Sequence, residues 1–278
     1  MFQIKKTLTI ITALVLMLGV FGCSKSAKNK ISIKGSTTVL PITQKAMEEY
    51  SKINKDVAIS IDGSGSGNGI KALIDGSADI ANSSREMKDK EIELAKSKGI
   101  VVEEIVIALD CLAPVVHPKN KIDNITIDQL KGIYSGTIKT WDKIPGSDSK
   151  ENIVVVSRDT SSGTFESWQE LVLKKVDVKK DAMMTASSGQ VATTISGNEK
   201  AIGYVGFGYL NESLKALKVN GVEATLENGQ SGKFPISRKL YIYVNKNKIS
   251  KETRAFIDYL LSADGQAVVK KAGFIPVK

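Results

Sequence analysis

The sequence is poor in the residues on which covalent catalysis and metal binding usually depend. It has one histidine, His117, which precedes Pro118 in a loop and is remote in sequence from every serine cluster. No group of His, Cys, Asp or Glu has the spacing of metal ligands. A hydrolase that uses a nucleophile or a metal is therefore poorly supported, and we expect no enzyme activity, no metal and no other cofactor.

Cysteine is equally scarce, with Cys23 and Cys111 as the two examples. Cys23 ends an N-terminal targeting segment, so Cys111 is left without a disulfide partner and stability must come from core burial. Cys111 lies in the apolar stretch 105–116, where we expect a buried, unreactive thiol.

Long apolar runs are also lacking, apart from 8–20, which follows Lys5 and Lys6 and is too short for a comfortable membrane span. The run ends at Phe21-Gly22-Cys23 and resembles a lipoprotein signal. We expect 1–22 to be the signal, Cys23 to carry lipid (palmitate) and 23–30 to be a tether. The alternative is a plain signal peptide with an incidental cysteine. Either way the chain is exported, and the lipid would anchor it to the outer face of the cell membrane.

The basic charge does not indicate nucleic acid. Removal of Lys5 and Lys6 with the signal, and of no acid, changes the formal charge from +9 to +7. The remaining lysines alternate with Glu and Asp, as in 88–91 and 174–177, and no arginine-rich patch with interleaved aromatics is present. Solubility and mild attraction of anions are the inferences we draw.

A nucleotide site is poorly supported as well. The glycine-rich stretch 63–71 lacks the Gly-Lys-Ser/Thr ending of a phosphate-binding P-loop. Gly67-Asn68-Gly69-Ile70-Lys71-Ala72 fits a permissive dinucleotide pattern, but the next strand ends at Asn82-Ser83-Ser84, with no acid placed for a ribose.

Strand-like and helical patterns alternate from Ile31 onward, which predicts an α/β fold with parallel strands. The stretch 101–116 reads as a strand pair with a break near Asp110, and the pattern restarts beyond Pro118. From 239 a strand and two amphipathic helices look like a return to the first domain. We expect two lobes, 31–112 plus 238–278 and 113–237. Crossing segments near 109–116 and 235–240 would join them, with a ligand between.

Four clusters of Gly, Ser and Thr stand where a strand pattern gives way to a helical one. The first turn of a helix has free N–H groups and the positive end of the helix dipole, and small hydroxyl residues add O–H donors. Four clusters, one with an arginine, predict a cage for a tetrahedral oxyanion. They are Gly35-Ser36-Thr37-Thr38, Gly63 to Gly69, Asn82-Ser83-Ser84-Arg85, and Arg158 to Thr164.

The fourth cluster is the most specific. The apolar strand 153–156 leads into Arg158, and the helix from Phe165 follows Ser162-Gly163-Thr164 directly. Consecutive N–H groups, two hydroxyls and the guanidinium can therefore meet at one point. Asp159 either orients the arginine through an ion pair or is a surface turn acid.

On these clusters the chain resembles the phosphate-binding lipoproteins of the Pst-type phosphate ABC importers, over nearly all of its mature length. The resemblance implies a two-lobed type II periplasmic-binding-protein fold that closes on inorganic phosphate. It also implies partners, namely the membrane permease and ATPase subunits of the importer; we expect a monomer that binds no nucleic acid. The implied phosphate ligands are Thr37, Thr38, Ser66, Ser84, Arg158, Ser162, Gly163 and Thr164, with Ser36 and Gly65 as further candidates.

One position departs from the family pattern. Family members often end the third cluster with an aspartate that accepts the proton of bound phosphate, whereas this chain has Ser84 followed by Arg85. Asp62 and Asp110 are the candidates to replace that acid, each with a structural alternative as a turn, cap or hinge residue. Arg85 either adds a second cation or pairs with Glu86 or Asp89. Sulfate, molybdate or another tetrahedral oxyanion remains the alternative ligand, and a secreted phosphoester hydrolase the alternative class.

Overall fold

The structure is a computed structural model that describes residues 29–277. The expected signal segment and the lipid-carrying Cys23 lie outside these residues. The strands are β1 (Asn29–Gly35), β2 (Val57–Asp62), β3 (Ile80–Ser83), β4 (Val102–Val116), β5 (Asn124–Ile125), β6 (Val154–Arg158), β7 (Met183–Thr185), β8 (Ala201–Gly206), β9 (Lys215–Ala216), β10 (Lys218–Val219) and β11 (Ser237–Asn245). The helices are α1 (Leu40–Ile53), α2 (Ser66–Ile74), α3 (Asp89–Ser97), α4 (Ile127–Ser135), α5 (Gly163–Trp168), α6 (Ser188–Ser196), α7 (Leu226–Gln230), α8 (Lys251–Leu261) and α9 (Ala263–Lys271), with the π-helix Gln169–Leu173 and the 3₁₀ helices Trp141–Lys143 and Phe207–Tyr209.

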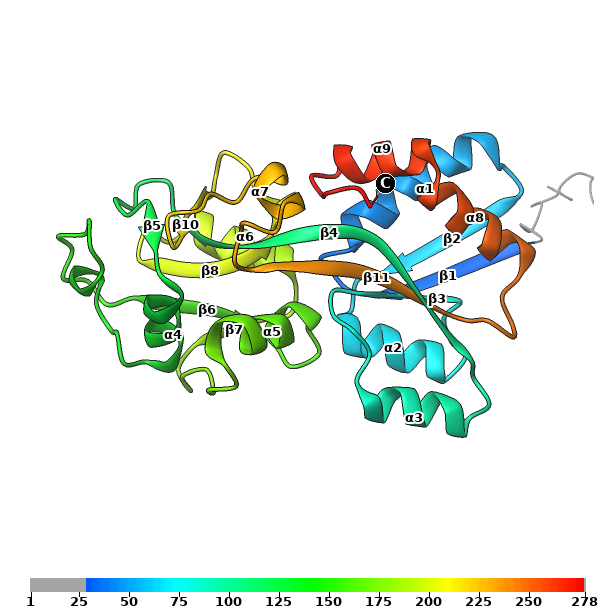
Figure 1. Cartoon of the computed structure of the whole chain (residues 1–278), viewed down its shortest axis with the longest axis horizontal. Helices are drawn as coiled ribbons and strands as arrows, with labels where there is room; N and C mark the ends of the chain where they lie inside the picture. Colours follow the sequence, from blue (N-terminus) through cyan, green and yellow to red (C-terminus); the bar gives the residue numbers. More distant parts are fainter. Residues whose placement is uncertain (1–28, 278) are drawn as a thin grey trace, which may run out of the picture.

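The described chain forms two halves side by side, joined by β4 and β11 (Figure 1). One nine-stranded sheet runs through both halves in the order β2-β1-β3-β11-β4-β8-β6-β7, with β9 added to β4. Strands β5 and β10 make a separate small sheet. The α/β class that the alternating pattern predicts is confirmed. We call the half that contains β1 the first lobe and the half that contains β6 the second lobe.

In the first lobe, β1 pairs with β2 and β3 in parallel, and α1 and α2 are the connections. Ile31 and Ile33 on β1 are fully buried, as the predicted apolar strand requires. Parallel strands direct their carboxyl ends to one edge of a sheet, and ligands bind at that edge in open α/β folds. The residues after β1, β2 and β3 are the first three hydroxyl clusters.

In the second lobe, β6 pairs in parallel with β7 and β8, so their carboxyl ends also share an edge. Strand β7 and helix α7 were not expected from the sequence. Met183 and Met184 in this three-residue strand are exposed, and a segment this short is below the four residues over which an alternating pattern indicates a strand.

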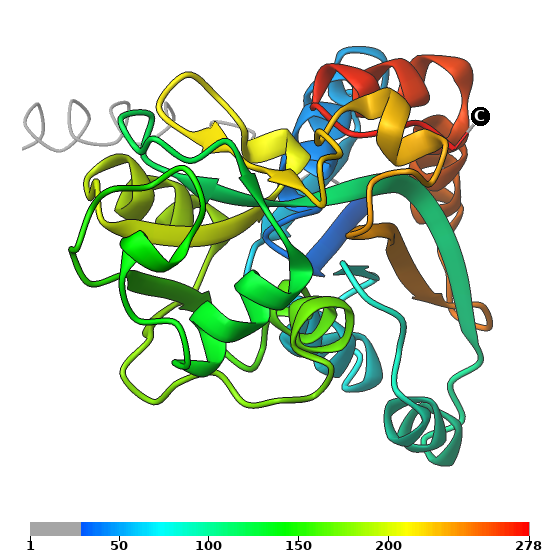
Figure 2. The same ribbon diagram turned by 60° about the vertical axis from the view of Figure 1, so that its left-hand side comes forward.

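The crossing between lobes differs from the prediction at one point. Strand β4 is continuous over 15 residues, pairing first with β11 as far as Cys111 and then with β8 from Leu112. The expected break near Asp110 is wrong, because Arg238 on β11 pairs with that buried carboxylate and removes the reason to interrupt the strand. Figure 2 shows β4 as one long curved strand. The exact lobe boundaries remain a prediction.

A third segment also crosses between the lobes. After α9 the chain pairs with β4 through two hydrogen bonds between Leu109 and Ile275, of 2.8 and 3.0 Å. Ile275 is buried among the apolar side chains of the second lobe, in the cluster that contains Cys111 and Phe234. The C-terminal tail thus reaches the second lobe, whereas the sequence pattern predicts that 238–278 lies as a whole in the first.

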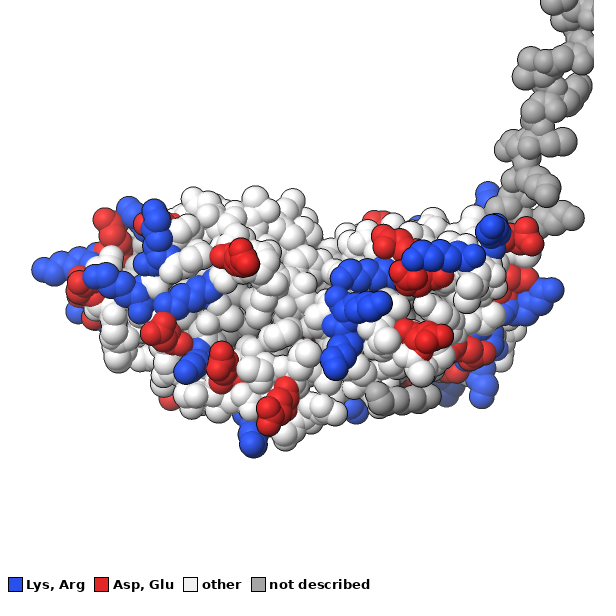
Figure 3. All heavy atoms as spheres, turned by 90° about the horizontal axis from the view of Figure 1, so that it is seen from above, with Lys and Arg blue, Asp and Glu red and all other residues white. Residues whose placement is uncertain are grey.

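Charged side chains are interspersed on the outer surface. On the face in Figure 3, basic and acidic side chains alternate over both lobes, with a group of basic side chains beside the junction. Among the described residues, no helix is long and apolar enough to cross a membrane.

Candidate functional site

Hydroxyl side chains from the two lobes meet at the junction between the carboxyl edges of the two parallel strand sets. Thr38 Oγ1 lies 2.8 Å from Thr164 Oγ1 across the junction. Thr37 Oγ1 lies 3.3 Å from Ser188 Oγ, and Ser84 Oγ lies 3.4 Å from Thr164 Oγ1. All five residues are buried. The lobes are therefore in direct contact through polar groups.

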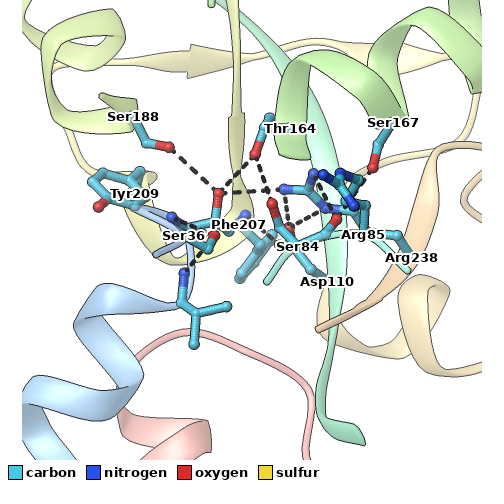
Figure 4. Close-up of polar contacts among 12 residues, drawn as sticks. Ser36, Ser84, Arg85, Asp110, Thr164, Ser167, Ser188, Phe207, Tyr209 and Arg238 are labelled. Atoms are coloured by element: carbon cyan, nitrogen blue, oxygen red, sulfur yellow. Dashed lines mark hydrogen bonds and ion pairs between the residues drawn. The ribbon is translucent and has the colours of Figure 1, made fainter. Parts of the chain in front are cut away.

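Ser66 completes this set on the first lobe. Its Oγ lies 3.3 Å from Ser84 Oγ and accepts the Ser84 N–H at 3.1 Å. The hydroxyls of Thr37, Thr38, Ser66, Ser84, Thr164 and Ser188 form what we call the hydroxyl cluster. Figure 4 shows several of its members with their hydrogen bonds.

Arg158 is the cation of the site. It is 1 % exposed, and among residues 29–277 no carboxylate lies within ion-pair distance of its guanidinium. Nη1 donates to Ser188 Oγ at 3.1 Å, while Nε and Nη2 donate to the carbonyls of Thr185 and Ala186. Burial lowers the pKa of Arg158. A buried guanidinium bound only by neutral groups is costly without an anionic partner.

A hydrogen bond from its main chain to a tyrosine side chain positions Arg158 at the end of β6. Its N–H donates to Tyr204 Oη at 3.2 Å, and the Tyr204 ring stacks on Trp168 with centroids 4.2 Å apart. Asp159 does not pair with Arg158; its Oδ1 accepts the N–H and the O–H of Ser161. Of the two alternatives for Asp159, an ion pair with Arg158 or a turn acid, the structure shows the turn acid.

Glycines let the lobes approach closely at the cluster. A Cβ atom at Gly163, the first residue of α5, would lie 2.4 Å from Ser66 Oγ and 2.8 Å from Ser84 Oγ. Gly65 has φ +99°, and a Cβ there would lie 2.5 Å from Ser161 Oγ. Gly67 N–H in turn donates to Ser161 O at 3.0 Å. The Gly-Ser pattern of the sequence thus serves contact between lobes as well as helix starts.

Two predicted hydroxyls act as helix caps. Ser36 Oγ accepts the N–H groups of Thr38 and Val39 at the start of α1. Ser162 Oγ accepts the Phe165 N–H at the start of α5. These caps fix the loops, and they leave the first N–H groups of α5, at Gly163 and Thr164, without partners inside the helix.

Asp62 and Arg85 do not join the cluster. Asp62 is exposed at the end of β2. Arg85 forms two hydrogen bonds with Glu91, of 2.7 and 2.8 Å, and its Nε lies 2.9 Å from Glu166 of the second lobe. The expected pairing with the carboxylate of Glu86 or Asp89 is wrong, because Glu91 and Glu166 already enclose the guanidinium.

Asp110 is buried beside the cluster but is already satisfied. Arg238 Nε and Nη2 donate to its Oδ2 at 3.0 and 2.9 Å, and Phe207 N–H donates to Oδ1 at 2.9 Å. Burial raises the pKa of Asp110, against the opposing effect of Arg238. In the described residues, no carboxylate makes a hydrogen bond to the hydroxyl cluster.

Ser188, Arg238 and Tyr209 are site residues that sequence reasoning missed. Ser187-Ser188-Gly189 has the same hydroxyl and glycine pattern as the four clusters, but the strand before it is too short and exposed to be noticed. Tyr209 Oη donates to the Thr37 carbonyl across the junction. Arg238 follows an apolar segment with no motif, so only the fold reveals it. His117 lies after β4, where Nδ1 accepts the Lys119 N–H.

Comparison with known proteins identifies the family of this chain. A family model described as the PBP superfamily domain matches residues 24–264. The chain is 35 % identical to the phosphate-binding protein PstS of Borreliella burgdorferi over 99 % of both chains. It is 36 % identical to PstS of Staphylococcus saprophyticus, over 91 % of this chain and 83 % of that protein.

Solved structures agree. A substrate-binding protein described as belonging to a phosphate ABC transporter of Clostridium perfringens, solved with bound phosphate, has a TM-score of 0.84 and 37 % identity. That comparison covers 90 % of this chain and all of the other. An ABC-type phosphate transport receptor from Vibrio cholerae has a TM-score of 0.71 and 30 % identity, over 88 % and 99 % of the two chains. The expected two-lobed type II fold is confirmed, and the chain belongs to the PBP superfamily and, within it, to the PstS family of phosphate-binding proteins.

Proposed function

We propose that this protein captures inorganic phosphate between its two lobes and delivers it to an ABC-type phosphate permease. The observation that carries the proposal is Arg158, a buried guanidinium that has no carboxylate partner within residues 29–277 and donates to Ser188 of the hydroxyl cluster. The names of the PstS relatives and the phosphate in the Clostridium perfringens structure support it. The ligand-binding residues that we assign are Thr37, Thr38, Ser66, Ser84, Arg158, Ser162, Gly163, Thr164 and Ser188.

Binding by this site requires no covalent step. Charge-assisted hydrogen bonds from Arg158, O–H groups of both lobes and the first N–H groups of α5 would hold the oxyanion in a water-excluded junction. Because the donors come from both lobes, the anion stabilises their closed arrangement. Closure would then signal occupancy to the permease.

The cellular setting is part of the proposal. An exported chain anchored through lipid on Cys23 would stay close to the permease and ATPase subunits at the outer face of the membrane. We propose a monomer, because the binding residues assigned above all come from one chain.

A second ligand is favoured by one observation. No carboxylate of the described residues makes a hydrogen bond to the hydroxyl cluster, so none is placed to repel by direct contact a fully deprotonated anion such as sulfate or molybdate. A carboxylate that accepts the proton of hydrogen phosphate would discriminate between these ions. Sulfate binding is therefore the alternative to exclude.

Titration calorimetry tests both ligands. The purified chain, freed of bound ligand by unfolding and refolding, is titrated with phosphate, sulfate and molybdate in separate experiments. We expect heat with phosphate and much weaker binding of the other two. Absence of heat with phosphate would refute the proposal, and stronger binding of sulfate would assign the protein to the alternative ligand. Turnover of a generic phosphomonoester would instead point to a hydrolase.

A further inference from the structure

Asp110 and Arg238 form a buried ion pair where the two crossing strands pass the hydroxyl cluster. Asp110 lies on β4 and is fully buried, and the Arg238 side chain, on β11, is 6 % exposed. The two residues are paired in register across these antiparallel strands. Figure 4 shows them beside Ser84.

Arg238 reaches the cluster as well as Asp110. Its Nη2 lies 3.5 Å from Thr38 Oγ1, and its Nη1 lies 3.5 Å from the Ser84 carbonyl. Thr38 Oγ1 is in turn 2.8 Å from Thr164 Oγ1 at the junction. A second guanidinium is therefore one side chain away from the place where the lobes meet.

Asp110 makes no hydrogen bond to the hydroxyl cluster and contacts Arg238 instead. Its Oδ2 takes both bonds from Arg238, and its Oδ1 takes the Phe207 N–H. Asp110 is nevertheless close to the cluster, because a Cβ at Gly206 would lie 2.8 Å from both Asp110 Oδ2 and Thr38 Cγ2. Its negative charge is thus near the ligand position without contacting it.

The ion-paired charges around the junction sum to zero. Asp110 cancels Arg238, whereas Arg158 forms no ion pair within residues 29–277 and is acted on through space by the charge of Asp159. Arg85 and Lys88 are balanced by Glu91 and Glu166. A neutral residue in place of Asp110 would raise the charge at the junction by one unit, and a neutral residue in place of Arg238 would lower it by one unit. In a water-poor site a unit charge acts strongly over such distances.

We propose that Asp110 and Arg238 set the charge of the anion site: Arg238 is a second cation that attracts the ligand, and Asp110 attenuates it. The inference rests on the proposed phosphate function and deepens it. Asp110 is a positioning residue, because it makes its side-chain hydrogen bonds to Arg238 and to the Phe207 N–H, whereas Arg238 itself reaches Thr38 Oγ1 of the hydroxyl cluster. The pair would match the site to an anion of limited charge and keep binding reversible enough for release to a permease.

Three variants test the inference against a merely structural role. Asp110→Asn leaves Arg238 uncompensated, and we expect phosphate to bind about tenfold more tightly. Arg238→Gln leaves Asp110 uncompensated, and we expect binding at least tenfold weaker. The double variant restores the original charge with a neutral pair, and we expect affinity within about threefold of the unchanged protein. Calorimetry with phosphate gives the affinities, and thermal melting without phosphate gives the stabilities.

A structural salt bridge predicts a different pattern. Both single variants would then lower the melting temperature and weaken phosphate binding together, and that outcome would overturn the inference. If one single variant fails to fold, the test compares the phosphate affinity of the double variant with that of the remaining single variant. The inference requires these two affinities to differ by about tenfold. Glu103→Gln and Arg254→Gln are the matched controls. They break another ion pair of β4 and should leave phosphate affinity unchanged.

The proposed function and the inference fail separately. An unchanged protein that does not bind phosphate refutes the function. A protein that binds phosphate, but whose two single variants change affinity in the same direction, refutes the charge-setting pair alone.

Discussion

Arg85 of the first lobe and Glu166 of the second form an ion pair across the junction, with Nε 2.9 Å from Oε2. The Nε–H is not aligned for a hydrogen bond, so the contact is chiefly electrostatic. Lys88 adds a second contact to Glu166 at 2.7 Å, and Glu91 holds Arg85 from its own lobe. Glu166 lies two residues after Thr164, so one member of the ion pair and one member of the hydroxyl cluster share the short helix α5.

Glu166→Gln should therefore weaken phosphate binding without removing a ligand. The side chains are partly buried, so we expect a loss of about 1–2 kcal/mol, between the values typical of surface and buried pairs. The loss should appear as faster dissociation, because the pair exists only when the lobes touch. Stopped-flow release of phosphate at low and high salt measures it. Glu170→Gln, an exposed neighbour, is the control; an equal effect there would contradict the prediction.

Arg158→Ala should nearly abolish phosphate binding. Removing one partner of a buried charge-assisted contact costs about 2–5 kcal/mol. Arg158→Lys keeps the charge but not the fork of donors, so we expect an intermediate affinity. Calorimetry gives the constants, and unchanged affinity in Arg158→Ala would place the site elsewhere.

Gly163→Ala should block closure while the separate lobes stay folded. The added Cβ would meet Ser66 Oγ and Ser84 Oγ below 3.0 Å when the lobes touch, and the backbone at this residue has no positive φ to oppose alanine. We expect phosphate affinity to fall at least tenfold with little change in melting temperature without ligand. Gly189→Ala, in the first turn of α6, is the matched control because its nearest neighbour is 3.8 Å away. Similar losses in both variants would count against a steric cause.

Acid stability should depend on Glu91. Burial raises the pKa of this carboxyl, but the hydrogen bonds from Arg85 and the Lys88 N–H outweigh it, so the pKa falls below its usual 4.5. A depressed pKa in the folded state gives stability that is present above pH 4.5 and is lost as the pH falls through the folded value. The free energy of unfolding, measured with urea between pH 3 and 6, should rise with pH. Its slope should be up to about 1.4 kcal/mol per pH unit steeper than in Glu91→Gln. Equal slopes would show that other acids dominate.

The Cys111 thiol should be inert in the folded protein. Burial and the charge of Asp110 raise its pKa to about 12. In a chain that lacks the signal and Cys23, a thiol reagent at pH 8 should label Cys111 only after denaturant is added. Rapid labelling of the native protein would contradict its buried position.

Much of the fold and part of the site followed from local patterns. Alternating apolar runs and helical periodicity locate β1, α1, β6 and α5, because each of these elements buries apolar side chains in the core. The hydroxyl clusters and Arg158 were found because helix starts and an arginine at a strand end are local features. Gly163 shows the limit of local patterns. The sequence predicts its place at the start of a helix, but not its close approach to Ser66 of the other lobe.

The rest depends on contacts between distant segments. Arg238 was missed since its partner, Asp110, is 128 positions away, and no motif marks either residue. Arg85 was judged by its neighbours in sequence, yet Glu166, 81 positions onward, meets it only when the lobes close. Asp62 ends a strand at the correct edge but points to solvent, and side-chain direction at a strand end is not fixed by spacing.

The pairing of Leu109 with Ile275 has a mechanical consequence. Strands β4 and β11 alone would form a two-stranded connection about which the lobes could bend easily. The C-terminal tail adds a third attachment beside that connection, anchored in the core of the second lobe. Bending away from the tail would stretch it, whereas rotation about the long axis of β4 leaves its length nearly constant. The tail after α9 therefore opposes bending of the lobes away from it more than rotation about β4.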